Sequence, residues 1–309
     1  MARGCAPGVI IADLELSITI CSWNAREDLR ACLASLRDRA NEARFETIVI
    51  ENNSEDGSGD MVAQEFPEVR LFRQGVNLGF CGGHNVGVGH MLGKHWFCLN
   101  SDTIVHEGAL RRMIDCLEAN SEIAILGPKL LNTDGSLQYS VRRFPNPVAA
   151  LFRNTLLGRL WPSNPFTRTY LMKDFDHDAP IDADWVSGAA FMMSRRALDS
   201  VGTFDPEYYM FCEDVDLCFR CHRAGFRVHY LPTAHVTHHI GRSTDKAPNR
   251  MIVRFHKSMY LFFKRNQIRD FAPLARPLML FVAASGLTLR ASAFIIKNLI
   301  DRLGRRLRR

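Results

Sequence analysis

Two clusters of oxygen-bearing side chains have spacings suited to metal binding or proton transfer. Asn100-Ser101-Asp102 follows an apolar segment and places an amide and a carboxylate two residues apart. Such a pair can hold a divalent cation that also contacts the phosphates of a nucleotide. Glu213-Asp214-Val215-Asp216 begins a predicted helix, where the helix dipole alone would favour acids. Mutual repulsion among these carboxylates can also raise the pKa of one of them toward that of a general base.

Two further segments could complete a site. The pair His238-His239 follows the last predicted strand and could supply a metal ligand, although a solvated loop is the alternative interpretation. Residues 77–85, NLGFCGGHN, are rich in glycine and lead into a predicted helix. Their glycines would let the backbone approach a ligand closely, near the amides of a helix N-terminus. The segment matches neither common phosphate-binding glycine motif, so alone it is a weak signal.

The first half of the chain alternates strand and helix patterns. The apolar runs predict strands at 16–21, 45–50, 69–74, 95–100 and 123–128, with helices near 59–66, 83–93 and 107–119. This alternation predicts a doubly wound, mainly parallel α/β sheet covered by helices on both faces. Ligands bind such sheets at the carboxyl ends of the strands, and polar residues follow three of these ends. These residues are 22–24, 51–58 and 100–102.

The rhythm changes after residue 130. Residues 140–180 contain five prolines and no clear period, which predicts a loop-rich insertion of the kind that often covers a substrate. A strand at 185–194, a helix at 212–224 and a strand at 226–232 follow.

Charge is divided unevenly along the chain. The net charge is +6, but residues 250–309 hold 14 Lys and Arg against Asp270 and Asp301, so the preceding residues carry a net −6. An evenly basic nucleic-acid-binding protein would not show this division. Nine scattered cysteines indicate reduced thiols in a cytoplasmic protein, and residues 1–15 make a poor signal peptide.

Taken in order, these segments resemble the family 2 glycosyltransferases, inverting enzymes of the GT-A fold. The resemblance is carried by SWN, ENNSEDGS, NLGFCGGHN, LNSDT, GPKLLNTDGSLQ, WVSGAAFMMSRRALDSVGTFD, FCEDVDLCFR and VTHHIGRS, and it covers residues 16–245. It is greatest to the rhamnosyltransferase-type branch that builds bacterial cell-surface polysaccharides.

The resemblance implies a role for each matching position. Ser22, Asn24 and Glu51 would hold the base and ribose, although the family usually has Asp where this chain has Glu51. The remaining donor-pocket residues would be Asp56, Asn77, Gly79, Gly82, Gly83, Asn85, Asn100 and Ser101.

The resemblance also implies a metal site and a catalytic base. Asp102 would be the principal ligand of Mg²⁺ or Mn²⁺, and His238 the next, with His239 as the fallback. Trp185, Ser187 and Gly188 would form the wall between donor and acceptor. Asp214 would be the base, with Glu213 orienting either the base or the acceptor.

The implied reaction is transfer of a sugar, rhamnose in the leading hypothesis, from a dTDP- or UDP-linked donor. The acceptor would be a glycan or a lipid-linked molecule. Two alternatives are a nucleotidyltransferase acting on sugar phosphates and a non-catalytic nucleotide-sugar-binding membrane protein. Three retained side chains, Asp102, Asp214 and His238, argue against the second alternative.

The division of charge predicts two regions. Residues 1–249 would form the catalytic domain, with a nucleotide-sugar half at about 16–128 and an acceptor half at about 129–249. Residues 250–309 would form a basic helical tail. Its uncharged segment 277–289 ends at Arg290 and is predicted to be an interfacial or buried helix rather than a membrane span.

The end of this tail has leucines spaced like one face of a helix among basic residues. Leu299, Leu303 and Leu307 recur every four residues, a pattern attracted to anionic lipid. A solvated helix or an oligomer contact, such as a homodimer, is the alternative. We therefore expect a peripheral enzyme on the cytoplasmic face of the inner membrane, with no nucleic-acid partner.

Overall fold

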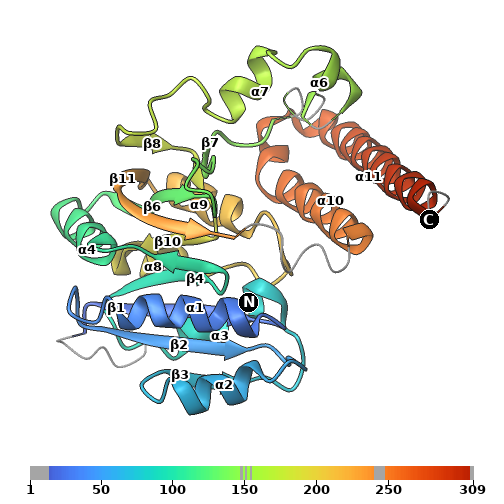
Figure 1. Ribbon diagram of the computed structural model, residues 1–309. Helices are drawn as coiled ribbons and strands as arrows, with labels where there is room; N and C mark the ends of the chain where they lie inside the picture. The colour runs from blue at the N-terminus through green and yellow to red at the C-terminus, as the bar shows by residue number, and fades with distance from the viewer. Residues whose placement is uncertain (1–13, 147–148, 150–151, 154, 240–247, 307–309) are drawn as a thin grey trace.

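A mixed sheet of nine strands lies at the centre of the protein (Figure 1). The computed structural model describes residues 14–146, 149, 152–153, 155–239 and 248–306. The strand order is β3-β2-β1-β4-β10-β6-β11-β5, and β8 also pairs with β11. Neighbours from β3 to β4 are parallel, as are β6 and β11, whereas β10 is antiparallel to both β4 and β6. The predicted α/β fold with a mainly parallel sheet is confirmed.

The first half of the chain supplies most of the parallel strands. Its elements are β1 (Leu16–Ser22), α1 (Arg26–Arg37), β2 (Phe45–Glu51), α2 (Ser58–Glu65), β3 (Arg70–Arg73), α3 (Gly79–Gly89), β4 (His95–Asn100), β5 (Thr103–Val105), α4 (Ala109–Ala119) and β6 (Ile123–Leu131).

The second half inserts strands into the same sheet and adds helices outside it. Its elements are β7 (Val141–Arg142), α6 (Leu156–Leu160), α7 (Pro165–Tyr170), β8 (Ile181–Ala183), β9 (Trp185–Val186), β10 (Ala190–Met193), α8 (Arg195–Val201), α9 (Glu213–Arg223), β11 (Arg227–His238), α10 (Pro248–Arg265), the short 3₁₀ helices η1 (Gln267–Asp270) and η2 (Pro273–Ala275), and α11 (Arg276–Arg306).

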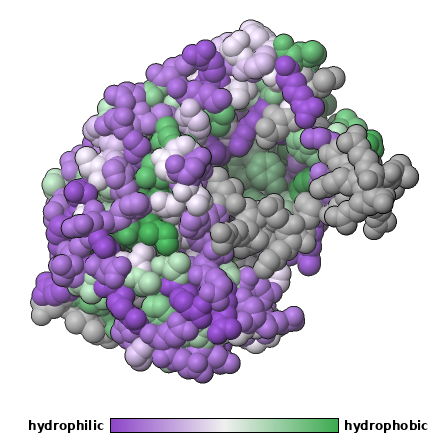
Figure 2. Space-filling model, in the orientation of Figure 1, coloured by the Kyte–Doolittle hydropathy of each residue, from purple (hydrophilic) through white to green (hydrophobic). Residues whose placement is uncertain are grey.

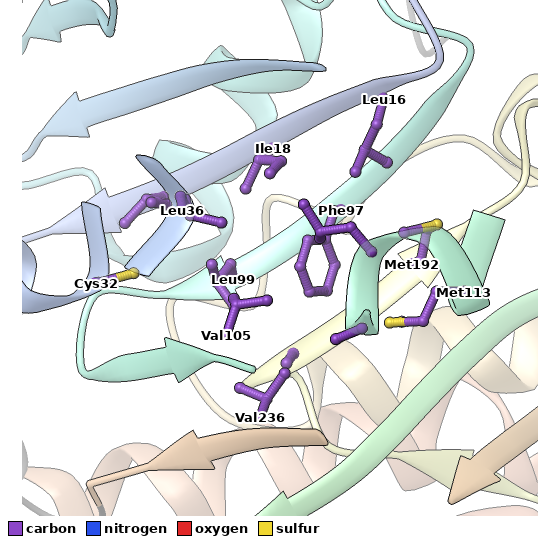
Figure 3. Packing of buried hydrophobic residues seen from close by; sticks show 14 of the residues in the cluster. Leu16, Ile18, Cys32, Leu36, Phe97, Leu99, Val105, Met113, Met192 and Val236 are labelled. Carbon is purple, nitrogen blue, oxygen red and sulfur yellow. The ribbon is translucent and has the colours of Figure 1, made fainter. Parts of the chain in front are cut away.

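Hydrophobic clusters cover both faces of the sheet. On one face α1, α2 and α4 pack on the strands, and Figure 3 shows Ile18, Phe97 and Leu99 in this cluster. On the other face α3, α8 and α9 pack around Trp96 and Phe191. Complete burial of such side chains contributes about 1.5–3 kcal/mol each, so these clusters hold the strand ends in fixed positions.

Several element boundaries differ from those expected. The run expected as one strand at 185–194 is two strands, β9 and β10, separated by residues 187–189. The expected final strand at 226–232 continues as β11 to His238, pairing with β5 near its end. The insertion at 140–180 contains β7, α6 and α7 between its loops.

The C-terminal region also differs from the expected tail. Helix α10 packs on the body, with Phe262 buried in the same cluster as Trp96. The apolar segment 277–289 and the basic segment beyond Arg290 belong to one helix, α11, of 31 residues. Segment 277–289 was expected to be either an interfacial or a buried helix. The buried alternative is wrong, because none of the residues in the apolar window found in Pro273–Ile300 is buried. Leu307 lies outside the described residues.

Candidate active site

The carboxyl ends of β1, β2 and β4 lie next to one another at one edge of the sheet. Ser22 is the register partner of Glu51, and Cys21 is the register partner of Asn100. The structure therefore confirms that these polar strand ends lie together, as the sequence predicted.

The loop after β2 is held by its own polar side chains. Glu51 is buried, and its Oε1 accepts a hydrogen bond from the Ser54 amide at 2.5 Å. Asn24 adopts a φ of +50°, and its Oδ1 accepts from the Glu55 amide at 2.8 Å. Ser22 is fully buried, and its hydroxyl has no partner among the described residues. A contact of these side chains to a nucleotide stays a prediction.

Asp56 is fixed in the same loop. Its Oδ2 accepts from the Arg26 amide at 2.9 Å, and its Oδ1 accepts from the Ser58 amide at 3.0 Å. Partial burial would raise the pKa of Asp56, but hydrogen bonds from Ser58 and Arg26 outweigh it and lower that pKa. Asp56 is thus an ionised carboxylate at the edge of the sheet.

The sequence did not single out Asn52, which organises the glycine-rich segment. Asn52 is buried, and its Nδ2 donates to Asn77 Oδ1 and to the Gly79 carbonyl, both at 3.1 Å. Its Oδ1 accepts from the Leu78 amide at 2.8 Å. Tyr209 donates to the same Asn77 oxygen at 2.9 Å. An amide next to the acid at a strand end was the only available signal for Asn52, and Tyr209 had none.

The glycines of this segment are closely packed by protein atoms. Gly79 has a φ of +75°, and a Cβ there would lie 2.6 Å from the Tyr209 carbonyl oxygen. A Cβ on Gly83 would lie 2.3 Å from Cys21 Sγ, and one on Gly82 would lie 2.9 Å from Leu78 Cβ. Asn85 donates to the Phe204 carbonyl at 2.8 Å. Packing alone accounts for the glycines, whereas Asn85 Oδ1 is buried without a partner among the described residues. A contact of any of them to a donor stays a prediction.

Replacing Gly83 with Ala is expected to destabilise the protein by about 1–3 kcal/mol, because the new methyl group overlaps Cys21 on β1. Gly89 ends the same helix, and a Cβ added there would meet no described atom within 4 Å, so Gly89→Ala is the matched control. The control should be neutral or slightly stabilising. Thermal unfolding of both variants tests the packing, and equal melting temperatures would contradict it.

A histidine from β11 faces the acid that follows β4. His238 Nε2 lies 3.4 Å from Asp102 Oδ1 and 3.3 Å from Asn100 Nδ2. On its other side His238 Nδ1 lies 2.8 Å from Gln138 Oε1. Gln138 Nε2 donates to the His238 carbonyl at 3.2 Å and to Asn132 Oδ1 at 3.1 Å, so its oxygen must face the imidazole. His238 Nδ1 therefore carries a proton that it donates to Gln138, and Nε2 faces Asp102.

His239 points to a different partner. Its Nδ1 lies 2.7 Å from Thr133 Oγ1, while its amide donates to the Asp102 carbonyl at 2.9 Å. Within the described ranges no three His, Cys, Asp or Glu side chains gather as a metal site. The structure thus brings Asp102 and His238 together, and their role as metal ligands stays a prediction.

The second acidic pair begins α9 after a strained backbone. Phe211 and Cys212 both have positive φ, +71° and +64°, which turns the chain sharply into the helix. Half-buried Asp214 then accepts hydrogen bonds from the amides of Gly188 at 2.9 Å and Val215 at 2.8 Å. A Cβ on Gly188 would lie 3.4 Å from Asp214 Cβ. The break between β9 and β10 therefore exposes the Gly188 amide to this carboxylate.

Asp214 and Glu213 line a cavity of about 530 Å³ with Trp185, Ser187 and Arg142. Trp185 is fixed there by its Nε1, which donates to the Arg143 carbonyl at 2.8 Å, and the Arg142 guanidinium lies 5.0 Å from the Trp185 ring centre. Two of the three expected wall residues, Trp185 and Ser187, thus share one cavity with the two acids, and the third, Gly188, contacts Asp214 through its amide.

The two acids have different surroundings. Burial, and then the charge of Asp214, raises the pKa of Glu213 well above its ordinary value. Glu213 Oε2 has no hydrogen-bond partner in the described structure. Burial also raises the pKa of Asp214, but the amides of Gly188 and Val215 and the charge of Arg142 oppose that rise. Asp214 is therefore the acid of this pair whose ionised form is stabilised.

At pH values above neutral, the Glu213→Gln variant is expected to have a higher melting temperature than the unaltered protein. Folded Glu213 keeps a proton that the unfolded chain loses near a pKa of about 4.3, so the free energy of unfolding falls as pH rises between the two pKa values. Gln has no proton to lose, and this part of the pH dependence disappears. Melting curves at about pH 5 and about pH 8 test it, and identical slopes for both proteins would reject it.

The chain is similar to known glycosyltransferases. Residues 14–253 match the family model described as glycosyltransferase like family 2. The chain is 30% identical to an N-acetylglucosaminyl-diphospho-decaprenol L-rhamnosyltransferase of Mycobacterium tuberculosis, over 80% of this chain and 83% of that protein. It is 25% identical to the rhamnosyltransferase WbbL of Escherichia coli, over 72% of this chain and 83% of that protein.

A solved structure shares the fold. The mannosyltransferase PcManGT of Pyrobaculum calidifontis, in complex with GDP-Man and Mn²⁺, superposes with a TM-score of 0.57 at 16% identity, covering 96% of this chain and 83% of that one.

Proposed function

The chain belongs to glycosyltransferase family 2, and from this premise we propose that it transfers rhamnose from dTDP-rhamnose to a hydroxyl of a lipid-linked glycan acceptor. Sugar transfer follows from the family. The donor and acceptor are proposed because two relatives are named as rhamnosyltransferases, one of them with a diphospho-decaprenol acceptor. The observation that carries the mechanism is Asp214, held by two backbone amides in the cavity.

We assign the proton transfer to Asp214. Its carboxylate takes the proton of the acceptor hydroxyl as that oxygen attacks the anomeric carbon, and the bond from this carbon to the donor diphosphate breaks. Attack and departure occur on opposite faces of the sugar, so the configuration inverts. A single base is sufficient for this displacement, and the raised pKa of Glu213 favours its neutral form beside Asp214.

The residues around Asp102 fit a divalent cation. Their donor set is one carboxylate, one imidazole whose Nε2 faces that carboxylate, and the Asn100 amide beside them. Carboxylate and carbonyl oxygens suit Mn²⁺ or Mg²⁺, and an imidazole in the set favours Mn²⁺ of the two, because Mg²⁺ is the harder cation. Such an ion would neutralise charge on the leaving diphosphate. Gln138 contacts the other nitrogen of His238, Nδ1, and so fixes a proton there.

We further propose that the protein works at the cytoplasmic face of the inner membrane. Helix α11 supports this, because Pro273–Ile300 is long and apolar enough to cross a membrane by length and composition.

Thermal shifts with nucleotide sugars test the proposed donor. We expect dTDP-rhamnose with Mn²⁺ to raise the melting temperature by a few degrees, as ligand present at about 100 times its Kd adds about 2.7 kcal/mol. UDP-N-acetylglucosamine is the comparison. A larger shift with the UDP-sugar would replace the donor, and an unchanged shift without Mn²⁺ would remove the metal requirement.

A further inference from the structure

Three arginines converge on the cavity that holds Asp214. Arg142, Arg153 and Arg290 all line it, and they come from β7, the insertion and α11. Within the described structure none of them forms an ion pair with a carboxylate, unlike most arginines on the body. The cavity therefore holds more positive charge than the protein itself neutralises.

Each of these guanidinium groups is fixed in place. Arg142, Arg153 and Arg290 lie 5.0, 5.3 and 5.5 Å from the ring centres of Trp185, Tyr170 and Phe294. Arg153 Nη1 donates to Tyr170 Oη at 3.1 Å, and Arg290 Nη2 donates to the Arg153 carbonyl at 2.9 Å. The Nε groups of Arg142 and Arg290 are buried without a partner among the described residues. Ordered guanidinium groups with unused donors form a site for phosphate oxygens.

The electrostatics of the cluster favour the binding of an anion. Burial, followed by the charge of Arg153, lowers the pKa of both Arg142 and Arg290. Like charges held together at this cost are stabilised when a phosphate binds between them.

An apolar groove continues from this cluster. It has a volume of about 640 Å³, lies between α10 and α11, and shares Met259, Arg290 and Phe294 with the catalytic cavity. Its walls are mainly apolar and include Phe263, Met279, Ala283 and Leu287. In the view of Figure 2 the surface is hollowed between the body and α11, with hydrophobic residues in the hollow.

The outer side of α11 is apolar as well. Exposed side chains recur there at helical spacing, at Leu278, Phe281, Leu289, Ile296 and Ile300. An exposed apolar stripe of this length indicates contact with a membrane. A groove on the inner side of the same helix is then open to molecules that come from the lipid phase.

We propose that the arginine cluster binds the diphosphate of a lipid-linked acceptor and that the groove between α10 and α11 holds the first part of its apolar chain. The order of the parts fits such a molecule, with the sugar beside Asp214, the phosphates at the arginines and the chain in the groove. The inference rests on the proposed sugar transfer but concerns a different part of the site from the donor.

Binding of farnesyl diphosphate to the full-length protein tests this proposal, with inorganic pyrophosphate and farnesol as the two partial probes. We expect farnesyl diphosphate to bind at least about 10-fold more tightly than either. Arg153→Gln and Arg290→Gln should each weaken it by about 10-fold or more, as charge-assisted hydrogen bonds do. Lys264→Gln, an exposed change of the same charge on α10, is the control and should bind normally.

A groove variant separates the lipid chain from the phosphates. Gly286 lines the groove, and a Cβ there meets no described atom within 4 Å, so Gly286→Trp fills the groove without a backbone clash. It should weaken farnesyl diphosphate and leave pyrophosphate unchanged. The proposal would be overturned if the unaltered protein bound farnesyl diphosphate and pyrophosphate with equal affinity. It would also be overturned if the arginine variants bound farnesyl diphosphate as tightly as the unaltered protein.

The donor is followed in the same variants. Thermal shifts with dTDP should be unchanged by Arg153→Gln and Arg290→Gln, and loss of dTDP binding would assign the arginines to the donor instead. Lipid binding without any nucleotide binding would leave this inference intact and reject the proposed function.

Discussion

Asp214→Asn is expected to lower kcat by about 10²–10⁴-fold, the usual contribution of a positioned general base. Asn keeps the size of the side chain and an oxygen that can accept from the Gly188 amide, so the cavity should keep its shape. Binding of the donor should be unchanged, because Asp214 acts on the acceptor hydroxyl. Steady-state kinetics with the acceptor and thermal shifts with dTDP measure the two effects separately.

The same residue sets the acid limb of the pH profile. Because burial raises the pKa of Asp214, activity should fall as pH decreases through a value above that of an ordinary aspartate. Glu207→Gln is the matched control, since it removes an exposed carboxylate that pairs with Arg265. Wild-type turnover in Asp214→Asn would remove this carboxylate from the mechanism.

Asp102→Asn is expected to weaken Mn²⁺ binding in the presence of dTDP by more than the 10–100-fold that loss of an outer partner typically costs. The variant removes the one carboxylate that faces His238 and keeps the size of the side chain. Donor binding should weaken with it, because fewer charges would then hold the diphosphate. Calorimetric titration of Mn²⁺ with and without dTDP measures both effects.

Asp115→Asn provides the control for Asp102. Asp115 forms an exposed pair with Arg111 on α4, away from the strand ends. If Asp102→Asn and Asp115→Asn bound Mn²⁺ equally well, the proposed ligand pair would be rejected.

The strands of the first half could be predicted to within a few residues because each is a short apolar run bounded by turn residues. The strands at 16–21 and 95–100 illustrate this, as β1 and β4 differ from them by one residue at most. Short-range pattern was insufficient for β5, a three-residue strand held by pairing with the distant β11. It also could not show the break at residues 187–189, where the Gly188 amide leaves the strands to meet Asp214.

The candidate site was predictable where residues lie at strand or helix ends. Asp102 and His238 come together because β5, which begins directly after Asp102, pairs with β11 and aligns Thr103 with His238. Gln138 and Asn52 were missed because an amide has no distinctive spacing, and its role depends on contacts up to 100 residues away.

The arginine cluster was missed for a different reason. Arg290 was interpreted as an interruption of an apolar segment, but α11 continues through it with the guanidinium turned into the cavity. The outer side of the helix therefore stays apolar. A linear hydropathy pattern cannot distinguish a charge that faces lipid from one that faces a cavity.

The antiparallel strand β10 has a consequence for how the chain is made. It lies between β4 and β6, although more than 50 residues separate it from β6 along the chain. Until residue 193 has left the ribosome, β4 and β6 each present an open edge to the same gap. A nascent or truncated chain that ends before this point exposes strand edges that favour aggregation. Chimeras that combine one half of this enzyme with the other half of a related enzyme are therefore expected to fold poorly.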